Sequence, residues 1–186
     1  MNTYKLYFFL LGCTPPNRHI EQHDVFFGIG TKPADLIPAL QGFWPEAKLH
    51  IDCWREVTSV DGFSVRVVPK QALDNQNGLY FLNLGGYRMG AFEEFHYKSL
   101  IVAASKADAI KKAKQTSFYK EFGFKGAVAH VDDAYGVDID DVFNVVDILS
   151  VSDKERFSVL IGDEVSDHLD VVHLGYMTLA KFKALK

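Results

Sequence analysis

The sequence predicts an α+β fold made by tandem duplication of a ββαββ unit, with antiparallel sheets, one helix per unit and a pseudo-twofold axis between the units. Three observations predict it: a set of motifs that occurs twice, a change from strand-like to helix-like periodicity within each copy, and short connections between strands. Short connections join antiparallel neighbours, which is why antiparallel sheets are expected. A further pair of strands is expected after the second copy.

The duplication is visible as motifs that recur at a constant offset. Leu6-Tyr7-Phe8 with Leu11-Gly12 returns as Leu79-Tyr80-Phe81 with Leu84-Gly85, an offset of 73 that becomes 80 after a seven-residue insertion. The polar motifs that recur are Glu21-x-His23 as Glu94-x-His96, and His50-x-Asp52 as His130-x-Asp132. Internal repetition of this kind decides the architecture before any local pattern is considered.

Each copy begins with two strands. Residues 4–11 and 78–84 are rich in Leu, Tyr and Phe, and a glycine follows each of them, so we expect the strands to end there. The second strands are expected at residues 22–29 and 96–103.

A helix follows in each copy. In the first copy Thr31 and Pro33 mark the start of a helix over residues 31–43, but Pro38 cannot donate a backbone hydrogen bond, so this helix should be short or kinked. In the second copy Ser105 and Asp108 have the spacing of a capping box, which predicts a helix over residues 105–118.

Two more strands close each unit. In the first copy, residues 50–57 and 63–68 flank Asp61-Gly62, a pair typical of tight hairpin turns. The counterparts in the second copy and the extra C-terminal pair are expected at residues 128–137, 142–149, 157–161 and 169–174.

The two copies are expected to share one core. A unit of roughly 70 residues buries little apolar surface by itself, so a lone core would be only marginally stable. We therefore expect one compact domain made of residues 4–70, residues 78–150 and a C-terminal extension, residues 151–186, that packs on the repeats.

Composition and charge limit the kinds of partner that the chain is expected to bind. The net charge of −4 argues against nucleic acid, because phosphate binding relies on clustered Lys and Arg. The apolar run at residues 6–11 is shorter than the core of an export signal, and no segment approaches the ~18 apolar residues of a membrane span. We expect a soluble cytoplasmic protein without a membrane partner; the sequence leaves open whether it forms a homo-oligomer.

The two cysteines fit a reducing cytoplasm. Cys13 and Cys53 have no cysteine counterparts in the second copy, whereas a disulfide framework would be expected to repeat with its unit. Both are predicted to be free thiols. Because adjacent strand residues alternate between faces, Cys53 is expected to point away from Asp52 and His50.

The candidate site consists of polar residues that both copies retain. Within a strand, residues two apart share a face, so His50 and Asp52 should point the same way. Neutral imidazole and carboxylate are the ligands that zinc, iron and manganese use in proteins. The eight candidates are Glu21, His23, His50 and Asp52 in the first copy, and Glu94, His96, His130 and Asp132 in the second.

Two interpretations of these residues stay open. In the first, each histidine donates a hydrogen bond to a carboxylate and thereby stabilises a sheet or the contact between copies. This interpretation needs no cofactor. The chain is then a non-enzymatic module that binds a small ligand or a protein. Divergence between the loops at residues 12–18 and 85–90 favours this module, since loops carry specificity. In the alternative, His23, His50 and Asp52 hold one divalent transition metal in a hydrolase or an oxygenase.

Several motifs of the chain match those of a known family. They are Glu21-x-His23-Asp24 with Phe26-Phe27, Leu49-His50-Ile51-Asp52-x-Trp54, Val60-Asp61-Gly62-Phe63 and Leu79-Tyr80-Phe81-x-Asn83-Leu84-Gly85-Gly86-Tyr87. With them, residues 4 to about 150 resemble the bacterial family called domain of unknown function 1543, whose members carry one or two copies of the domain. The resemblance implies a soluble bacterial protein without an assigned activity, and it supplies no catalytic residue. The second copy departs from the pattern, with Tyr97 for Asp24 and Ala134 for Trp54.

Overall fold

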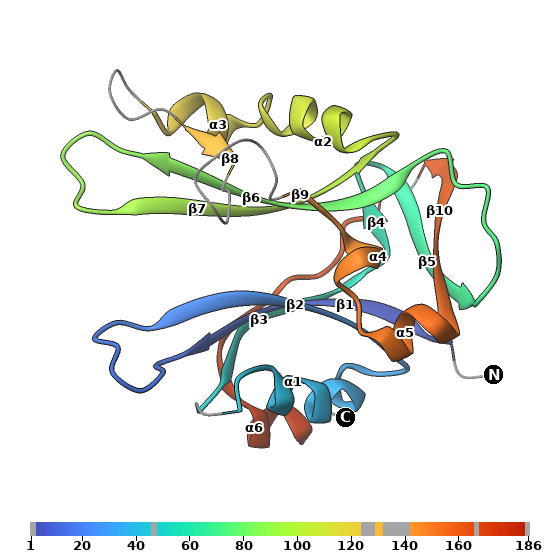
Figure 1. The fold of residues 1–186 in the computed structure, drawn as a ribbon, viewed down its shortest axis with the longest axis horizontal. Coiled ribbons are helices and arrows are strands. Elements are labelled where there is room, and N and C mark those ends of the chain that lie inside the picture. The colour runs from blue at the N-terminus through green and yellow to red at the C-terminus, as the bar shows by residue number, and fades with distance from the viewer. Residues whose placement is uncertain (1–2, 46–47, 124–128, 132–141, 166–167, 185–186) are drawn as a thin grey trace. The chain divides into compact units, whose positions relative to one another are not determined.

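The chain divides into two compact units. The computed structural model describes residues 3–45, 48–123, 129–131, 142–165 and 168–184 (Figure 1). Unit 1 is Met1–Leu73 together with Leu149–Lys186, and unit 2 is Asp74–Ile148. Every strand pair among the described residues is antiparallel, which confirms the α+β class with antiparallel sheets.

Unit 1 is built on a four-stranded sheet in which β1 is an inner strand. The strand order is β11–β3–β1–β2. The strands are β1 (Lys5–Cys13), β2 (Gln22–Gly30), β3 (His50–Val57) and β11 (His173–Thr178). The strand β1 continues through Gly12 to Cys13, so the prediction that it ends before the glycine is wrong.

One face of this sheet carries the core of unit 1. Tyr7, Phe9 and Leu11 alternate along β1 and therefore share a face, and each is at most 1% exposed. The helices that cover this face are η1 (Pro33–Leu36), α1 (Ile37–Phe43) and α6 (Leu179–Lys183), as Figure 1 shows. Phe182 of α6 is fully buried and meets Phe9 edge-on, with 5.8 Å between ring centroids.

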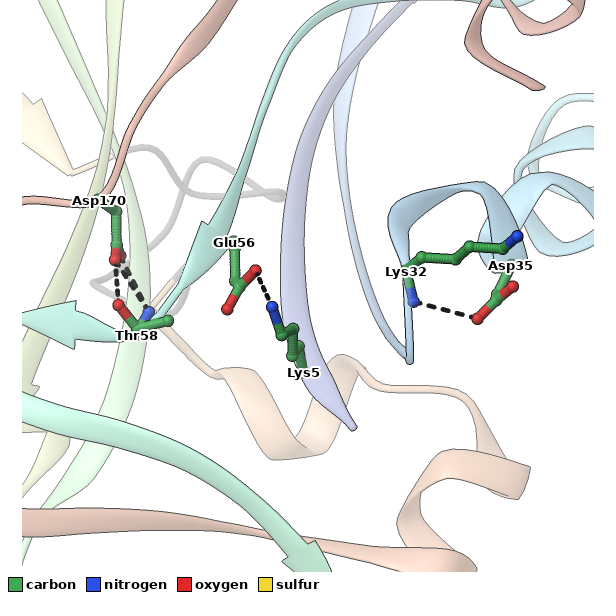
Figure 2. Close-up of polar contacts among 6 residues, drawn as sticks. All are labelled: Lys5, Lys32, Asp35, Glu56, Thr58 and Asp170. Carbon is green, nitrogen blue, oxygen red and sulfur yellow. Dashed lines mark hydrogen bonds and ion pairs between the residues drawn. The ribbon is translucent and has the colours of Figure 1, made fainter. Parts of the chain in front are cut away.

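The first predicted helix is indeed short. It begins with the single 3-10 turn η1, and Pro38 falls in the first turn of α1, where a missing donor costs little. The Asp35 carboxylate accepts from the Thr31 hydroxyl at 2.7 Å and from the Thr31 backbone N–H at 3.0 Å. It also accepts from the Lys32 backbone N–H at 3.1 Å, the contact that Figure 2 shows. The hydrogen bond from the Thr31 hydroxyl contributes most to holding the pKa of Asp35 below its usual value.

The predicted turn at Asp61-Gly62 is confirmed, but its second strand joins another sheet. Asp61 and Gly62 have φ values of 53° and 81°, and they connect β4 (Ser59–Val60) to β5 (Phe63–Pro69). Among the described residues β5 pairs with β4 and β10 (Phe157–Val165), not with β3 as a simple hairpin of residues 50–57 and 63–68 would require.

The C-terminal extension belongs to unit 1, and its two strands lie in different sheets. β10 starts at the predicted residue, whereas β11 starts four residues later than predicted and pairs with β3. The reason for the delay is Asp170, whose carboxylate accepts from the Thr58 N–H at 3.0 and 3.1 Å and from the Thr58 hydroxyl (Figure 2). The helix α5 (Val151–Arg156), capped by the Ser150 hydroxyl, was not expected.

Unit 2 is built on a second four-stranded sheet, and helices at residues 106–121 cover one of its faces (Figure 1). The strand β6 pairs with β7 on one side and with both β8 and β9 on the other. The elements are β6 (Gly78–Tyr87), β7 (Glu94–Ala103), α2 (Lys106–Ala113), α3 (Ser117–Glu121), β8 (His130–Val131), β9 (Val142–Asn144) and α4 (Val145–Ile148). Like β1, the strand β6 continues past the glycine at which it was expected to end.

Side-chain caps explain where the prediction fails in unit 2. The predicted helix over residues 105–118 starts at the Ser105 cap as expected, but Thr116 caps a separate helix, α3, by accepting from the Tyr119 N–H. The predicted strand over residues 142–149 ends at Asn144, whose side chain accepts from the Val146 N–H at 3.1 Å and starts α4. Most of the strand predicted over residues 128–137 lies outside the described residues; β8 is its described part.

Each unit has its own apolar cluster. In unit 2, side chains of β6 and β7 such as Leu82 and Ile101 pack against Ala109 and Ala113 of α2. A core shared between the copies and a pseudo-twofold axis stay predictions. Over the described residues, no helix has the length and apolar character needed to cross a membrane.

Replacing Phe182 with alanine tests whether the C-terminal helix is part of the unit 1 core. The variant should lose about 3–5 kcal/mol in the free energy of unfolding, because a fully buried aromatic ring is removed from contact with Phe9 and Trp54. Phe92→Ala is the control, since Phe92 is fully exposed. Equal urea midpoints for both variants would show that α6 does not stabilise the sheet.

Candidate functional site

Three neighbouring strands bring the first-copy candidates together. In the register of the sheet Gly12 on β1 is paired with His23 on β2 and with His50 on β3. Because glycine has no side chain, the two imidazoles approach each other over the middle strand. The candidates of the first copy therefore meet although β2 and β3 are not neighbours.

The side chains of Glu21, His23, His50 and Asp52 form a closed ring of contacts, here called the His/carboxylate cluster. The Nε2 atom of His50 lies 3.0 Å from Glu21 Oε1 and 3.3 Å from Asp52 Oδ1. The Nε2 atom of His23 lies 3.3 Å from Glu21 Oε2 and 3.3 Å from Asp52 Oδ2. Each carboxylate thus bridges both imidazoles with its two oxygen atoms.

The cluster has a buried floor and an exposed rim. The side chain of His50 is 5% exposed and that of Asp52 25%, while His23 and Glu21 are 40% and 41% exposed. Tyr176 of β11 covers His50, with 4.3 Å between the rings. His50 and Asp52 are therefore the two more buried members of the cluster.

The buried polar atoms at the floor lack hydrogen bonds. His50 Nε2 and Asp52 Oδ2 are both buried and neither has a hydrogen-bond partner among the described residues. Glu21 Oε1 and Asp52 Oδ1 lie within 3.3 Å of His50 Nε2, but neither contact has the geometry of a hydrogen bond. The cluster is therefore not a hydrogen-bonded histidine–carboxylate pair.

Gly12 leaves no room for a side chain. A Cβ atom added there would lie 2.8 Å from Asp52 Oδ2 and 2.9 Å from His50 Cε1, and closer still to His50 Nε2. The sequence signal for this role is the recurrence of Leu11-Gly12 as Leu84-Gly85, although a glycine after an apolar run is also typical of a strand end.

A β-bulge at Asp52 sets which side chains face the cluster. Leu10 pairs with Cys53 and Leu11 with Ile51, so Asp52 is an extra residue in β3. Cys53 therefore shares the face of His50, and the prediction that it points away is wrong, because simple alternation does not hold across a bulge.

Cys13 lies away from the cluster. Cys13 and Cys53 are free thiols, as predicted. Cys13 follows Gly12 and lies on the opposite face of β1, where it is fully buried. Burial, and to a lesser degree the Glu21 carboxylate, raises the pKa of the Cys13 thiol, so it stays protonated at neutral pH.

The second-copy candidates are only partly described. Gly85 of β6 is paired with His96 on β7 and with His130 on β8, in the same register as Gly12 with its two histidines. Glu94 and His96 each have interaction partners. The side chain of His130 and the whole of Asp132 lie outside the described residues, so no comparable cluster is described in unit 2.

No group of three or more His, Cys, Asp or Glu side chains in the described part of the chain already surrounds a common ion position. In the His/carboxylate cluster the donor atoms contact one another instead. The residue types are nevertheless those of zinc, manganese and non-haem iron sites.

Comparisons with known proteins cover the site and the fold. The sequence pattern of a family described as a domain of unknown function, DUF1543, matches residues 18–67, a single copy that contains all four residues of the cluster. No curated protein matches the chain. The crystal structure of a protein Il1583 from Idiomarina loihiensis is similar, with a TM-score of 0.54 and 21% identity over 95% of this chain and 97% of that chain. At this identity the similarity concerns the fold alone.

Substitution of two glycines with alanine tests the close packing over β1. Gly12→Ala should lower the free energy of unfolding by roughly 1–3 kcal/mol, because the new methyl group overlaps His50 and Asp52. Gly42→Ala is the matched control in the same unit: nothing lies within 4 Å of its added Cβ, and alanine in a helix should stabilise by roughly 0.5–1 kcal/mol. Urea denaturation measures both, and equal effects would contradict the packing.

Proposed function

We propose that unit 1 is a metal-binding module, in which Glu21, His23, His50 and Asp52 bind one divalent transition-metal ion. The observation that carries the proposal is the pair of buried, unpartnered atoms, His50 Nε2 and Asp52 Oδ2, inside a set of two imidazoles and two carboxylates. Such a buried polar atom costs about 1–3 kcal/mol when unsatisfied, and a bound cation would satisfy both atoms.

The separations of the donor atoms support this proposal. A tetrahedral zinc ion with bonds of about 2.0–2.1 Å holds its donor atoms about 3.3 Å apart. The four contacts of the cluster measure between 3.0 and 3.3 Å, but they involve both oxygen atoms of each carboxylate, so side chains must rotate to present one tetrahedral set of donors. His50 and Asp52 are held on β3, whereas the more exposed His23 and Glu21 can rotate to admit the ion.

Other carboxylates of unit 1 argue against a purely structural role. Asp35 accepts three hydrogen bonds from Thr31 and Lys32, and Asp170 is likewise satisfied by Thr58. These are the carboxylates that fix turns and connections in this unit. Asp52 differs because one of its oxygens is buried without a hydrogen-bond donor. Such an atom is better suited to binding a metal ion than to stabilising a turn.

A second candidate is a metal-dependent hydrolase, and one observation favours it. Two of the four donors stay about 40% exposed, so one side of the ion would face solvent. Structural zinc sites are closed, whereas catalytic sites keep a position for water or substrate. Hydrolysis of p-nitrophenyl esters or phosphates by the zinc-loaded protein, lost in His50→Ala, would favour this candidate over a module without enzymatic activity.

We also infer that unit 2 arose from unit 1 by tandem duplication. The equal registers around Gly12 and Gly85 support this inference, as does the recurrence of the Glu-x-His and His-x-Asp motifs. Because the second copy has diverged, we propose one metal ion per chain rather than two, in a bacterial cytoplasmic protein.

Metal analysis tests the proposed function directly. Protein purified without a histidine tag should carry, or take up from a zinc or manganese solution, about one equivalent of metal per chain. The metal should raise the melting temperature, because a ligand that binds only the folded state stabilises it. Elemental analysis and calorimetric titration measure the two effects.

Substitutions in the cluster test where the metal binds. His50→Ala should abolish uptake and the rise in melting temperature, and Asp52→Asn should weaken binding at least roughly tenfold. His168→Ala is the control, since His168 is an exposed histidine of the same unit outside the cluster. Uptake that is unchanged in His50→Ala, or absent from the folded wild-type protein, would refute the proposal.

A further inference from the structure

Tyr176 of β11 packs against His50, the most buried member of the His/carboxylate cluster. The two rings lie 4.3 Å apart, at an angle of 33°. The tyrosine itself is 68% exposed, whereas the side chain of His50 is 5% exposed. Tyr176 does not belong to the apolar cluster of unit 1, so its contact with His50 is not a consequence of core packing.

A bulge in β11 brings Tyr176 into this position. The pairing of β11 with β3 is interrupted after Leu174 and resumes at Met177, so Gly175 and Tyr176 together lie opposite one residue of β3, Asp52. Gly175 has a φ of 120°, a conformation that residues with a Cβ atom rarely adopt. The glycine therefore permits the bulge, and the bulge places the Tyr176 ring over the buried floor of the cluster.

No hydrogen bond fixes the orientation of the His50 ring. A histidine that binds a metal ion with one ring nitrogen usually donates a hydrogen bond from the other nitrogen to a carboxylate or a carbonyl group, which sets the direction of the ring. Neither ring nitrogen of His50 forms a hydrogen bond with a described residue. The contacts that orient this ring are therefore packing contacts, with Gly12 of β1 and with Tyr176.

The two sides of the cluster differ in their access to solvent. On the side of β11, the Tyr176 ring covers His50. On the side of β2, the side chains of His23 and Glu21 are 40% and 41% exposed. An ion bound in the cluster would therefore be shielded on the side of β11 and accessible on the side of β2.

We propose that Tyr176 is a positioning residue of the metal site. Its ring holds the His50 imidazole in the orientation in which Nε2 faces the two carboxylates, and it shields the ion from solvent on the side of β11. Exchange of the ion then takes place past His23 and Glu21. This inference rests on the proposed binding of a metal ion by unit 1.

Nuclear magnetic resonance of the metal-free full chain, in the presence of EDTA, tests the ring contact. The imidazole C–H resonances of His50, assigned by their loss in His50→Ala, should be shifted upfield by the Tyr176 ring. Tyr176→Leu should move them downfield, whereas Tyr176→Phe should leave them in place, because the ring makes the contact. Leu174→Ala is the matched control, since Leu174 is 80% exposed on the same strand. Resonances that do not move in Tyr176→Leu would contradict the proposal.

Zinc release tests the consequence for the metal. Release from the zinc-loaded protein to excess chelator should be roughly tenfold faster in Tyr176→Leu than in the wild type or in Tyr176→Phe, as expected when a group that orients a metal ligand is lost. The urea midpoint of metal-free Tyr176→Leu should equal that of the wild type, because Tyr176 is largely exposed. A lower midpoint would show a merely structural role and rule out positioning.

The same measurements separate this inference from the proposed function. Zinc uptake by the wild type, with equal release rates in Tyr176→Leu and Leu174→Ala, would overturn the role of Tyr176 alone. A folded wild-type protein that takes up no zinc would overturn the role of Tyr176 together with the metal-binding function.

Discussion

The candidate site of unit 1 depends on the absence of one side chain. Gly12 lies between two strands that each carry a histidine, and any Cβ atom at this position would occupy the space where the imidazoles and carboxylates converge. Adjacent strands lie ~4.8 Å apart, so residues on β2 and β3 are separated by about 10 Å of backbone. Long side chains such as histidine and glutamate span that distance only if the middle strand presents glycine.

The bulge in β3 is the second constraint, because even-numbered residues before and after it lie on opposite faces of the sheet. His50, Asp52, Trp54 and Glu56 have the even spacing that would place all four on one face of a regular strand. The extra residue at Asp52 changes the alternation, so His50 and Asp52 lie over Gly12, whereas Trp54 and Glu56 pair with Phe9 and Tyr7 on the core face. One strand thereby presents side chains of different chemistry on the two faces of the sheet.

Much of the fold follows from sequence patterns, and the exceptions have local causes. The strands β1, β2, β6 and β7 and the Asp61-Gly62 turn agree with apolar pattern and turn chemistry. Residues with strand-like composition at 145–148 form a helix because Asn144 caps it, and Thr116 divides the second predicted helix. The partner of β5 could not be predicted, since both β3 and β10 offer a compatible edge and only tertiary packing selects between them.

The composition of the site was predictable, but its chemical state was not. Glu21, His23, His50 and Asp52 stand out in the sequence because their Glu-x-His and His-x-Asp motifs occur twice. Sequence spacing cannot show whether a histidine donates a hydrogen bond to a neighbouring carboxylate. A histidine that does so has a structural role, whereas one that does not is available to bind a metal ion. The direction of the His50 N–H depends on the bulge at Asp52 and on the Tyr176 ring that covers His50. An unsatisfied buried imidazole is a cost to folding, and the cation that we propose would offset this cost by binding these donors.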